Sequence, residues 1–344
     1  MLFTCSVLVP LRILPEERFL TYLPHSGFHN QRIELENALL LAKHLNRSLI
    51  LPPLYLGDPL KWYPFDTLYD LLRKRDKAEL YYCSRVSSAM CDEYDSWTML
   101  PWNNIYNLTV FQDFLRLHER QTMEPEALSR FNNGSLEGIY YIKDIWKDEI
   151  HKLIYSHRSV INASNEIIRK LGGLGNYYSV HARIKGSIFI SNALENVESM
   201  VENLLRMMTL GNKHYSQTYA THATRPSLSQ CIKLQHGQPA EYPIVYLSTD
   251  SPDPLHNPNL TSLFRTFPCT FFAEDFQTEL TTLQREYNSL DGTSIGRFLV
   301  PMVESMVAAN GQYFVGTNKS TFSENIRYLH NTFLGRLDPI PLKY

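Results

Sequence analysis

The chain has 344 residues, of which 44% are hydrophobic and 20% charged, so it can bury a large core in about two domains of ~150 residues each. This composition excludes an intrinsically disordered protein. The 33 basic and 35 acidic residues give a formal net charge of -2, so no overall positive field attracts nucleic acid. The densest basic run, Arg73-Lys74-Arg75, is followed by acidic residues and is typical of a solvent-exposed helix face.

Neither a membrane span nor a zinc cluster is predicted. No apolar run reaches the length of about 18 residues that a bilayer requires. The apolar stretch in residues 1–18 resembles a short signal-peptide core, but no basic residue precedes it, and Pro10 and Arg12 end it early. Residues 1–18 are interpreted as an N-terminal tail or the remnant of a membrane anchor. The five cysteines lack any CxxC spacing, which argues against zinc, and a disulfide between Cys83 and Cys91 is one possibility.

The sequence contains six Asn-x-Ser/Thr acceptor sites for N-glycosylation, whereas this composition would give roughly three by chance. The excess favours the secretory pathway, that is, the lumen of the endoplasmic reticulum or Golgi. Asn46 and Asn318 are interpreted as structural instead, because one ends a predicted helix and the other lies in a predicted turn. The six sites are Asn46, Asn107, Asn133, Asn162, Asn259 and Asn318.

The first predicted domain begins with a strand, a helix and a second strand. Residues 18–23 predict the first strand, residues 31–45 an amphipathic helix, and residues 48–51 a buried strand that two prolines end. This order predicts parallel strands covered on both faces. Residues 59–130 are rich in aromatic side chains and predict irregular insertions and helices.

A cluster of glycines at residues 172–175 is interpreted as a hinge, which gives two domains, residues 19–172 and 173–344. The second domain alternates strands and helices as open parallel sheets do. A polar stretch over residues 226–243 predicts a surface excursion. The remaining predicted strands are residues 177–181, 244–248, 270–272 and 312–315, and the remaining predicted helices are residues 146–155, 164–171, 195–208, 296–310 and one that begins at Ser320 or Thr321.

The last predicted strand runs into a hydroxyl-rich turn that starts a helix. The first N–H groups of a helix are unpaired within the helix and carry partial positive charge, so such a turn is suited to phosphate. The alternative is a simple helix cap, since Glu324 lies three residues after Thr321 and would complete a capping box.

Three further polar clusters follow predicted strands, where open parallel sheets bind their ligands. The loop from His25 to Gln31 enters a helix but lacks GxGxxG, so the usual dinucleotide fingerprint is missing. Arg183 could bind two oxygens of a diphosphate, or form an ordinary surface ion pair. Asp250 could accept two N–H bonds from a guanine edge, or cap the turn before Pro252.

Taken in order, these loops carry a set of short sequences that is more specific than any one of them. The set resembles the GDP-fucose-dependent protein O-fucosyltransferases, particularly a fungal branch, from about residue 19 to 330. The matching pieces are Tyr22-Leu23-Pro24, Gly27-Phe28-His29-Asn30-Gln31, Leu45-Asn46-Arg47-Ser48-Leu49, His181-Ala182-Arg183, Tyr246-Leu247-Ser248-Thr249-Asp250, Ile295-Gly296-Arg297-Phe298, Phe314-Val315-Gly316-Thr317 and Ser320-Thr321-Phe322-Ser323.

The resemblance implies an α/β fold of the GT-B glycosyltransferase class, two Rossmann-like domains facing across a cleft, with the nucleotide held mainly by the second. It implies inverting transfer of fucose from GDP-fucose to a hydroxyl of a protein or glycan, with no metal or other cofactor. The absence of a DxD sequence at a strand end agrees with this expectation.

The resemblance also implies roles for individual residues. Arg183 would be catalytic by holding the β-phosphate and the leaving oxygen. The nucleotide-sugar contacts would come from the loop of the first domain, the two strand ends and the helix start of the second. Those contact residues are Gly27, Phe28, Asn30, His181, Asp250, Ser320, Thr321 and Phe322.

Two positions depart from the family pattern. One branch carries a glutamate base just before the loop glycine, where this chain has Ser26, so the base could be His25, His29 or Glu34, or be dispensable. Ser187 stands where many relatives have an acidic residue. Two alternatives therefore stay open: a catalytically silent protein that binds a nucleotide sugar or glycan, and a GT-B transferase that uses another nucleotide sugar.

Overall fold

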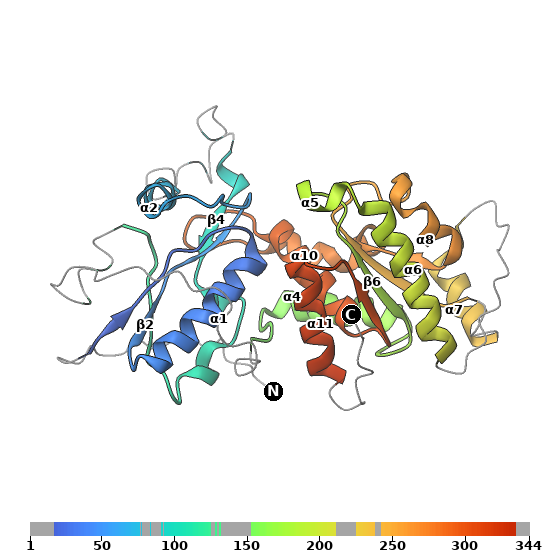
Figure 1. Ribbon diagram of the computed structural model, residues 1–344, viewed down its shortest axis with the longest axis horizontal. Coiled ribbons are helices and arrows are strands. Elements are labelled where there is room, and N and C mark those ends of the chain that lie inside the picture. Colours follow the sequence, from blue (N-terminus) through green and yellow to red (C-terminus); the bar gives the residue numbers. More distant parts are fainter. Residues whose placement is uncertain are drawn as a thin grey trace. The chain divides into compact units, whose positions relative to one another are not determined.

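The structure is a computed structural model and describes residues 17–75, 77, 83, 91, 93–124, 128, 131, 153–210, 225–237 and 242–334 (Figure 1). These residues form two compact units. The first holds the described chain up to Arg158 together with Gln284–Phe298. The second holds Ser159–Leu283 and the described chain from Leu299 onward. These bounds differ from the predicted division at residue 172, because helix α4 (Arg158–Lys170) belongs to the second unit and a late segment returns to the first.

The first unit contains a three-stranded parallel sheet in the order β1-β2-β5. Its strands are β1 (Phe19–Leu20), β2 (Ser48–Leu51) and β5 (Leu117–Glu119). The predicted parallel pairing of the first two strands is confirmed. Helix α1 (Phe28–His44) joins them and begins three residues earlier than predicted, because Gly27 is its N-cap and its carbonyl accepts the Gln31 N–H at 3.1 Å.

Within residues 59–130, the predicted irregular region, the structure contains helix α2 (Phe65–Arg73), short 3-10 turns and the strand β4 (Thr98–Leu100). β4 pairs antiparallel with β3 (Leu54–Leu56), outside the parallel sheet. The third parallel strand, β5, also lies here, and the sequence did not predict it. β5 has only three residues, too few to show the alternation of apolar and polar side chains that identifies a strand.

Buried polar contacts fasten Gln284–Phe298 to the rest of the first unit. The Asp291 carboxylate accepts a hydrogen bond from Thr98 Oγ1 at 2.6 Å and lies 3.6 Å from Lys77 Nζ. The same ammonium group donates to Thr293 Oγ1 at 2.7 Å. A buried ammonium needs an opposite charge nearby. These contacts therefore hold Lys77 and Thr98 against Asp291 and Thr293, about 200 residues later in the chain.

The second unit contains a four-stranded parallel sheet in the order β8-β7-β6-β9. The predicted alternation of strands and helices is confirmed there, with most ends moving by one or two residues. The exception is the helix predicted over residues 164–171, which is α4 and begins six residues earlier. The elements are β6 (Tyr178–Ala182), α5 (Ser187–Ile190), α6 (Ala193–Leu210), α7 (Leu228–Gly237), β7 (Val245–Thr249), α8 (Thr261–Thr266), β8 (Thr270–Phe271), α9 (Gln277–Leu280), α10 (Gly296–Ala309), β9 (Phe314–Gly316) and α11 (Thr321–Leu334).

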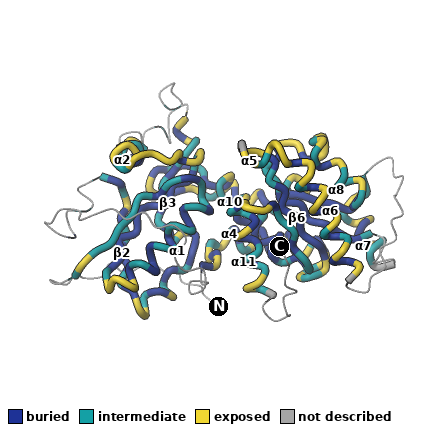
Figure 2. Tube along the Cα trace, in the orientation of Figure 1, coloured by how far each residue is buried: buried dark blue, intermediate teal, exposed yellow. Residues whose placement is uncertain are grey.

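Helices cover this sheet on both faces, as Figure 1 shows for α6 and α8 on one side of β6 and α11 on the other. The α6 side is a continuous apolar core that includes Val180, Val245, Leu204 and Leu263. All five residues of β6 are buried, and the strand is dark blue in Figure 2. Since β6 is covered on both faces, its alternate residues face either the apolar core or α10 and α11.

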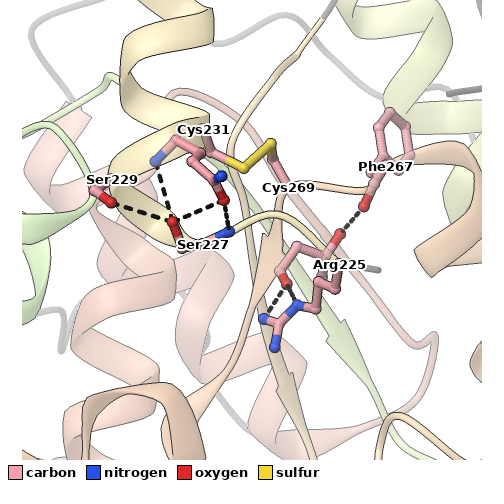
Figure 3. The surroundings of a disulfide bond; sticks show 8 residues. Arg225, Ser227, Ser229, Cys231, Phe267 and Cys269 are labelled. Atoms are coloured by element: carbon pink, nitrogen blue, oxygen red, sulfur yellow. Dashed lines mark hydrogen bonds between the residues drawn. A yellow bond between two sulfur atoms is a disulfide. The ribbon is translucent and has the colours of Figure 1, made fainter. Parts of the chain in front are cut away.

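The predicted surface excursion over residues 226–243 is wrong in part, because the structure has helix α7 there. A disulfide joins Cys231 of α7 to Cys269 beside β8, and both cysteines are fully buried (Figure 3). Nearby, the Arg225 guanidinium donates to the Thr270 carbonyl, with Nε at 2.9 Å. The composition of the stretch is polar, and a disulfide partner 38 residues away leaves no local sequence signal. The Cys83–Cys91 disulfide, which the sequence left as one possibility, is present.

Some predictions fall outside the described residues. They include the tail over residues 1–16, Cys5, Asn133 and most of the predicted helix over residues 146–155. Within that last range Tyr155 is described, and it forms an isolated bridge with Tyr106. In the described part of the chain, no helix combines the length and the apolar character that crossing a membrane requires.

Gly316 lets β9 pass close to helix α11, which gives a test of the fold. A Cβ atom at this position would lie 2.7 Å from Phe314 Cζ and 2.7 Å from Ser323 Oγ. We expect Gly316→Ala to lower the free energy of unfolding by about 1–3 kcal/mol through overpacking, as measured by urea unfolding. Gly27→Ala is the control, since its Cβ would come no closer than 3.7 Å to Pro59; equal losses in the two variants would contradict this packing.

Candidate active site

The carboxyl ends of β6, β7 and β9 meet at one edge of the second unit's sheet, and Asp250 joins two of them. Its Oδ1 accepts the Ile184 N–H at 2.7 Å, and its Oδ2 accepts the Lys185 N–H at 3.1 Å. Oδ2 also lies 3.2 Å from Arg183 Nε. The carboxylate at the end of β7 therefore fixes the backbone of the loop that follows β6.

Thr317 joins the loop after β6 to the end of β9. Its Oγ1 accepts the Arg183 N–H at 2.9 Å and donates to the His181 carbonyl at 3.2 Å. The Thr317 N–H donates to that same carbonyl at 3.1 Å. Arg183 is thus held through its own backbone and through the backbone of the residues that follow it.

The guanidinium group of Arg183 remains available to a ligand. Its side chain is 40% exposed, and its ion pair with Asp250 is made through Nε. Its two Nη groups make no hydrogen bond to any other described residue. The predicted ion pair and the predicted anion contact are therefore compatible, because a carboxylate on Nε leaves the outer fork of the guanidinium for two more oxygens.

Helix α11 begins beside this arginine-bearing loop. Ser320 is its cap, with Oγ accepting the Ser323 N–H at 3.4 Å, so the cap lies one residue before the predicted pair of Thr321 and Glu324. Ser320 is buried, whereas Thr321 and Phe322 are partly exposed. The first N–H groups of this 14-residue helix and the Arg183 guanidinium place positive charge at the same edge of the sheet.

His181 is buried beneath the helix start and is neutral. Its Nδ1 lies 2.6 Å from Ser323 Oγ, and the Phe322 ring lies over it with a centroid separation of 4.6 Å. Burial, together with the positive charge of Arg183, lowers the pKa of His181 to about 3. The imidazole therefore contributes shape and one hydrogen-bonding nitrogen to the site, and Arg183 supplies the charge.

Glu304 of α10 is a site carboxyl that the sequence analysis missed. It bonds to the Ser248 hydroxyl and the Thr249 backbone at the end of β7, and burial raises its pKa to about 8. The nearby carboxylates of Glu274 and Asp250 contribute to this rise in the pKa, and the two hydrogen bonds oppose it. The sequence did carry a signal for it, because Glu304 is the single acidic residue in the apolar run of residues 298–309. An ionisable side chain in such a run usually has a partner or a function.

The three predicted contacts of the first domain lie together at the start of α1. Gly27 is the N-cap, Phe28 is the first helical residue, and the Asn30 N–H donates to the Gly27 carbonyl at 3.0 Å. The Phe28 ring stacks near Tyr106, with a centroid separation of 6.2 Å and an angle of 18°. The second unit brings together the other six predicted residues, His181, Arg183, Asp250, Ser320, Thr321 and Phe322, at its own sheet edge. No cluster of three or more metal-binding side chains occurs among the residues the structure describes.

Comparison with known families decides what the ordered motifs mean. A family model described as GDP-fucose protein O-fucosyltransferase matches residues 19–331, most of the chain. The chain belongs to this family. O-fucosyltransferase 30 of Arabidopsis thaliana is 52% identical over 50 residues, which is 14% of this chain. That match spans 10% of the plant protein, so the chain matches only a small part of this curated relative's length.

Solved structures of fucosyltransferases align with most of the chain at low identity. A crystal structure of POFUT1 in complex with GDP is 13% identical, with a TM-score of 0.42, and the alignment covers 93% of this chain and 96% of that one. A crystal structure of fucosyltransferase NodZ from Bradyrhizobium is 12% identical, with a TM-score of 0.35, and the alignment covers 91% of this chain and 92% of that one. Two α/β units, each with a parallel sheet, are what the predicted GT-B class requires.

The half-buried Glu304 predicts a pH dependence of stability. Its folded pKa lies above the unfolded value near 4.5, so the stabilisation is complete below pH 4.5 and is lost as the pH rises through about 8. We expect Glu304→Gln to remove this loss, which amounts to at most about 1.4 kcal/mol per pH unit. Urea unfolding at pH 5 and pH 8 measures the difference.

Glu324→Gln is the matched control, because Glu324 is exposed on α11. The free energy of unfolding of Glu324→Gln should decrease from pH 5 to pH 8 by as much as that of the wild type. Parallel curves for the wild type and Glu304→Gln would show that Glu304 ionises at its ordinary pKa.

Proposed function

We propose that the protein transfers fucose from GDP-fucose to a hydroxyl of a protein or glycan, with inversion at the sugar and without a metal. The observation that carries this proposal is that the loop bearing Arg183 and the N-terminus of α11 lie at the same edge of the sheet, joined through Thr317, inside the region that matches the family. Both features recognise the oxygens of a diphosphate.

The proposed chemistry follows from where charge develops. When the bond from fucose to the diphosphate breaks, negative charge grows on the leaving oxygen and positive charge on the sugar ring. A cation that the backbone already holds in place stabilises the leaving group without reorganising during the reaction. Arg183 meets this requirement, because Thr317 and Asp250 fix the loop that carries it.

The guanine contacts are also a proposal. Asp250 was predicted to accept the N–H groups of guanine, and that contact stays a prediction. Its oxygens already accept two backbone N–H groups, which supports a role in holding the loop after β6. Glu304 places a second carboxyl at the end of β7, and a carboxyl there is chemically suited to the N–H donors of a guanine edge.

We also propose that the protein acts in the lumen of the secretory pathway. Its two disulfides, Cys83–Cys91 and Cys231–Cys269, support an oxidising compartment, since such bonds are rare where thiols are kept reduced. The acceptor is a protein or glycan hydroxyl, and the proposal gives the first unit, with its aromatic region, the acceptor side.

Two competing functions give different results with the purified chain. A catalytically silent protein would bind GDP-fucose without releasing fucose. Even slow release of fucose from GDP-fucose by the purified chain would therefore exclude a silent protein. A transferase for another sugar nucleotide would be stabilised by UDP or ADP more than by GDP. Nucleotide at about 100 times its dissociation constant should stabilise the fold by about 2.7 kcal/mol, which thermal melting detects.

The sharpest test of the proposed function is calorimetric titration with GDP in the presence of EDTA. We expect the wild type to bind GDP without metal and Arg183→Ala to bind it more weakly, because the variant lacks the charge that meets the β-phosphate. We further expect Arg183→Ala to lower the rate of GDP-fucose cleavage on the order of a hundredfold.

Arg183→Lys is the matched variant, since it keeps the charge and loses the two-pronged geometry. It should fall between the wild type and Arg183→Ala in both measurements. No binding of GDP or GDP-fucose to the wild type at millimolar concentration would overturn the proposed function.

A further inference from the structure

Lys319 lies in the turn that joins β9 to α11. The Thr317 carbonyl accepts the Ser320 N–H at 3.4 Å, which closes a four-residue turn with Lys319 at its third position. Ser320 is the cap of α11, and Thr317 holds the backbone of Arg183 through its Oγ1. The turn therefore connects the two features to which the proposed function assigns the diphosphate, the Arg183 loop and the helix start.

The backbone of Lys319 has a conformation that glycine adopts at lower cost. Its φ is +61°, in the left-handed region where the Cβ atom of an L-residue crowds the backbone. Glycine and asparagine are the usual residues at a turn position with positive φ. In the described part of the chain only three residues other than glycine have a positive φ, and Lys319 is the charged one among them. Because residues held in such conformations concentrate at functional sites, the strain points to a use for this side chain.

The ammonium group of Lys319 is available to a ligand. Lys319 is exposed and forms no hydrogen bond or ion pair with any residue that the structure describes. Glu324, the acidic residue in the first turn of α11, is exposed and is not paired with it. A lysine that served only solubility would gain nothing from a strained turn, because any exposed position would do.

The charges at this edge of the sheet favour an anion. Arg183 and Lys319 are cations, and the first N–H groups of α11 add partial positive charge. The Asp250 carboxylate is already paired with Arg183 Nε and with backbone N–H groups. The pKa of Glu304 is raised to about 8, so its carboxyl is mostly uncharged at neutral pH. A diphosphate would therefore meet little opposing charge here.

A lysine complements what the arginine can do. The planar fork of Arg183 fits two oxygens in a fixed geometry, whereas an ammonium is a compact charge with three donors on a flexible stem. Lys319 is two residues from Thr317, so their backbones lie within about 7 Å of each other. Both cationic side chains thus start beside the same threonine, and the lysine can follow diphosphate oxygens that the rigid fork does not bind.

We propose that Lys319 is a second cation of the donor site and binds the diphosphate of the sugar nucleotide together with Arg183. This role rests on the proposed function and adds a residue to which the family resemblance gives no part. The two matching sequences nearest to it are residues 314–317 and 320–323, and Lys319 lies between them. Its flexible stem is less preorganised than the Arg183 loop, so Lys319 acts mainly on binding and Arg183 on the leaving group.

The test is calorimetric titration with GDP of two variants that remove the same charge, Lys319→Ala and Lys319→Gly. We expect both to bind GDP about tenfold more weakly than the wild type, since hydrogen bonds to charged groups contribute on this scale. The loss should shrink at about 500 mM salt, where an exposed charge is screened within about 4 Å. Lys319→Arg keeps the charge and should bind GDP within about threefold of the wild type.

The same two variants separate the charge from the backbone strain. Glycine adopts a φ of +61° without a Cβ clash, so Lys319→Gly should melt at a higher temperature than Lys319→Ala while binding GDP equally weakly. Removal of a strained residue that serves binding should make the fold more stable and the site weaker. Thermal melting without nucleotide gives this comparison.

Lys233→Ala is the matched control, because it removes one positive charge from an exposed lysine of the same unit. Lys233 lies on α7, and Gln235 of that helix donates to the Asn176 carbonyl at 2.9 Å, just before β6 begins. The control charge therefore lies toward the opposite edge of the sheet. Lys233→Ala should bind GDP as the wild type does.

The outcomes separate the role of Lys319 from the function beneath it. A wild type that does not bind GDP at millimolar concentration overturns the proposed function. A wild type that binds GDP, with Lys319→Ala at the same affinity or with a loss that high salt leaves unchanged, overturns the role of Lys319 alone. A Lys319→Arg variant as weak as Lys319→Ala also overturns it, because the site would then not be using the charge.

Discussion

The capture of two backbone N–H groups by the Asp250 carboxylate is the interaction on which the candidate site depends. The end of a parallel strand leaves its backbone groups without partners, and a chain there has many conformations available. The Asp250 carboxylate, at the end of β7, accepts hydrogen bonds from the backbone N–H groups of Ile184 and Lys185. Thr317 Oγ1, at the end of β9, accepts the N–H of Arg183. Three neighbouring strands therefore determine one loop conformation, and the cation on that loop is placed before any ligand arrives.

The two faces of the same sheet carry different kinds of side chain. Towards α6 and α8 the strands present apolar residues such as Val180 and Leu247, which need only be packed. Towards α10 and α11 they present His181 and Ser248, which need hydrogen-bond partners once buried. Packing of the apolar face stabilises the fold and so offsets the cost of placing a buried neutral imidazole and a half-buried carboxyl on the other face.

The sequence predicted the elements whose signal is local. The run over residues 48–51 is a strand with those bounds, and Gly296 begins a helix as its apolar run requires. The predicted residues of the second unit, including Arg183 and Ser320, lie together because parallel strands end at the same edge. Their contacts with a nucleotide stay predictions.

What the sequence could not predict depends on contacts between distant residues. The Cys231–Cys269 bond, the place of Glu304 against β7, and the return of Gln284–Phe298 to the first unit each join positions with no shared local pattern. The hydrogen bond between His25 and Glu34 is nearer in sequence, nine residues apart. It joins a loop to a helix, and its existence depends on where Gly27 starts that helix.

The return of Gln284–Phe298 also governs the order in which the protein can fold as it is made. Lys77 and its partner Thr293 are 216 residues apart, so on a ribosome that adds about 5–20 residues per second the lysine waits about 10–40 s for that partner. The first unit is therefore synthesised early and completed late. Until Asp291 has been synthesised, the Lys77 ammonium lacks the carboxylate that accompanies its burial, so we expect this corner of the first unit to stay hydrated until then.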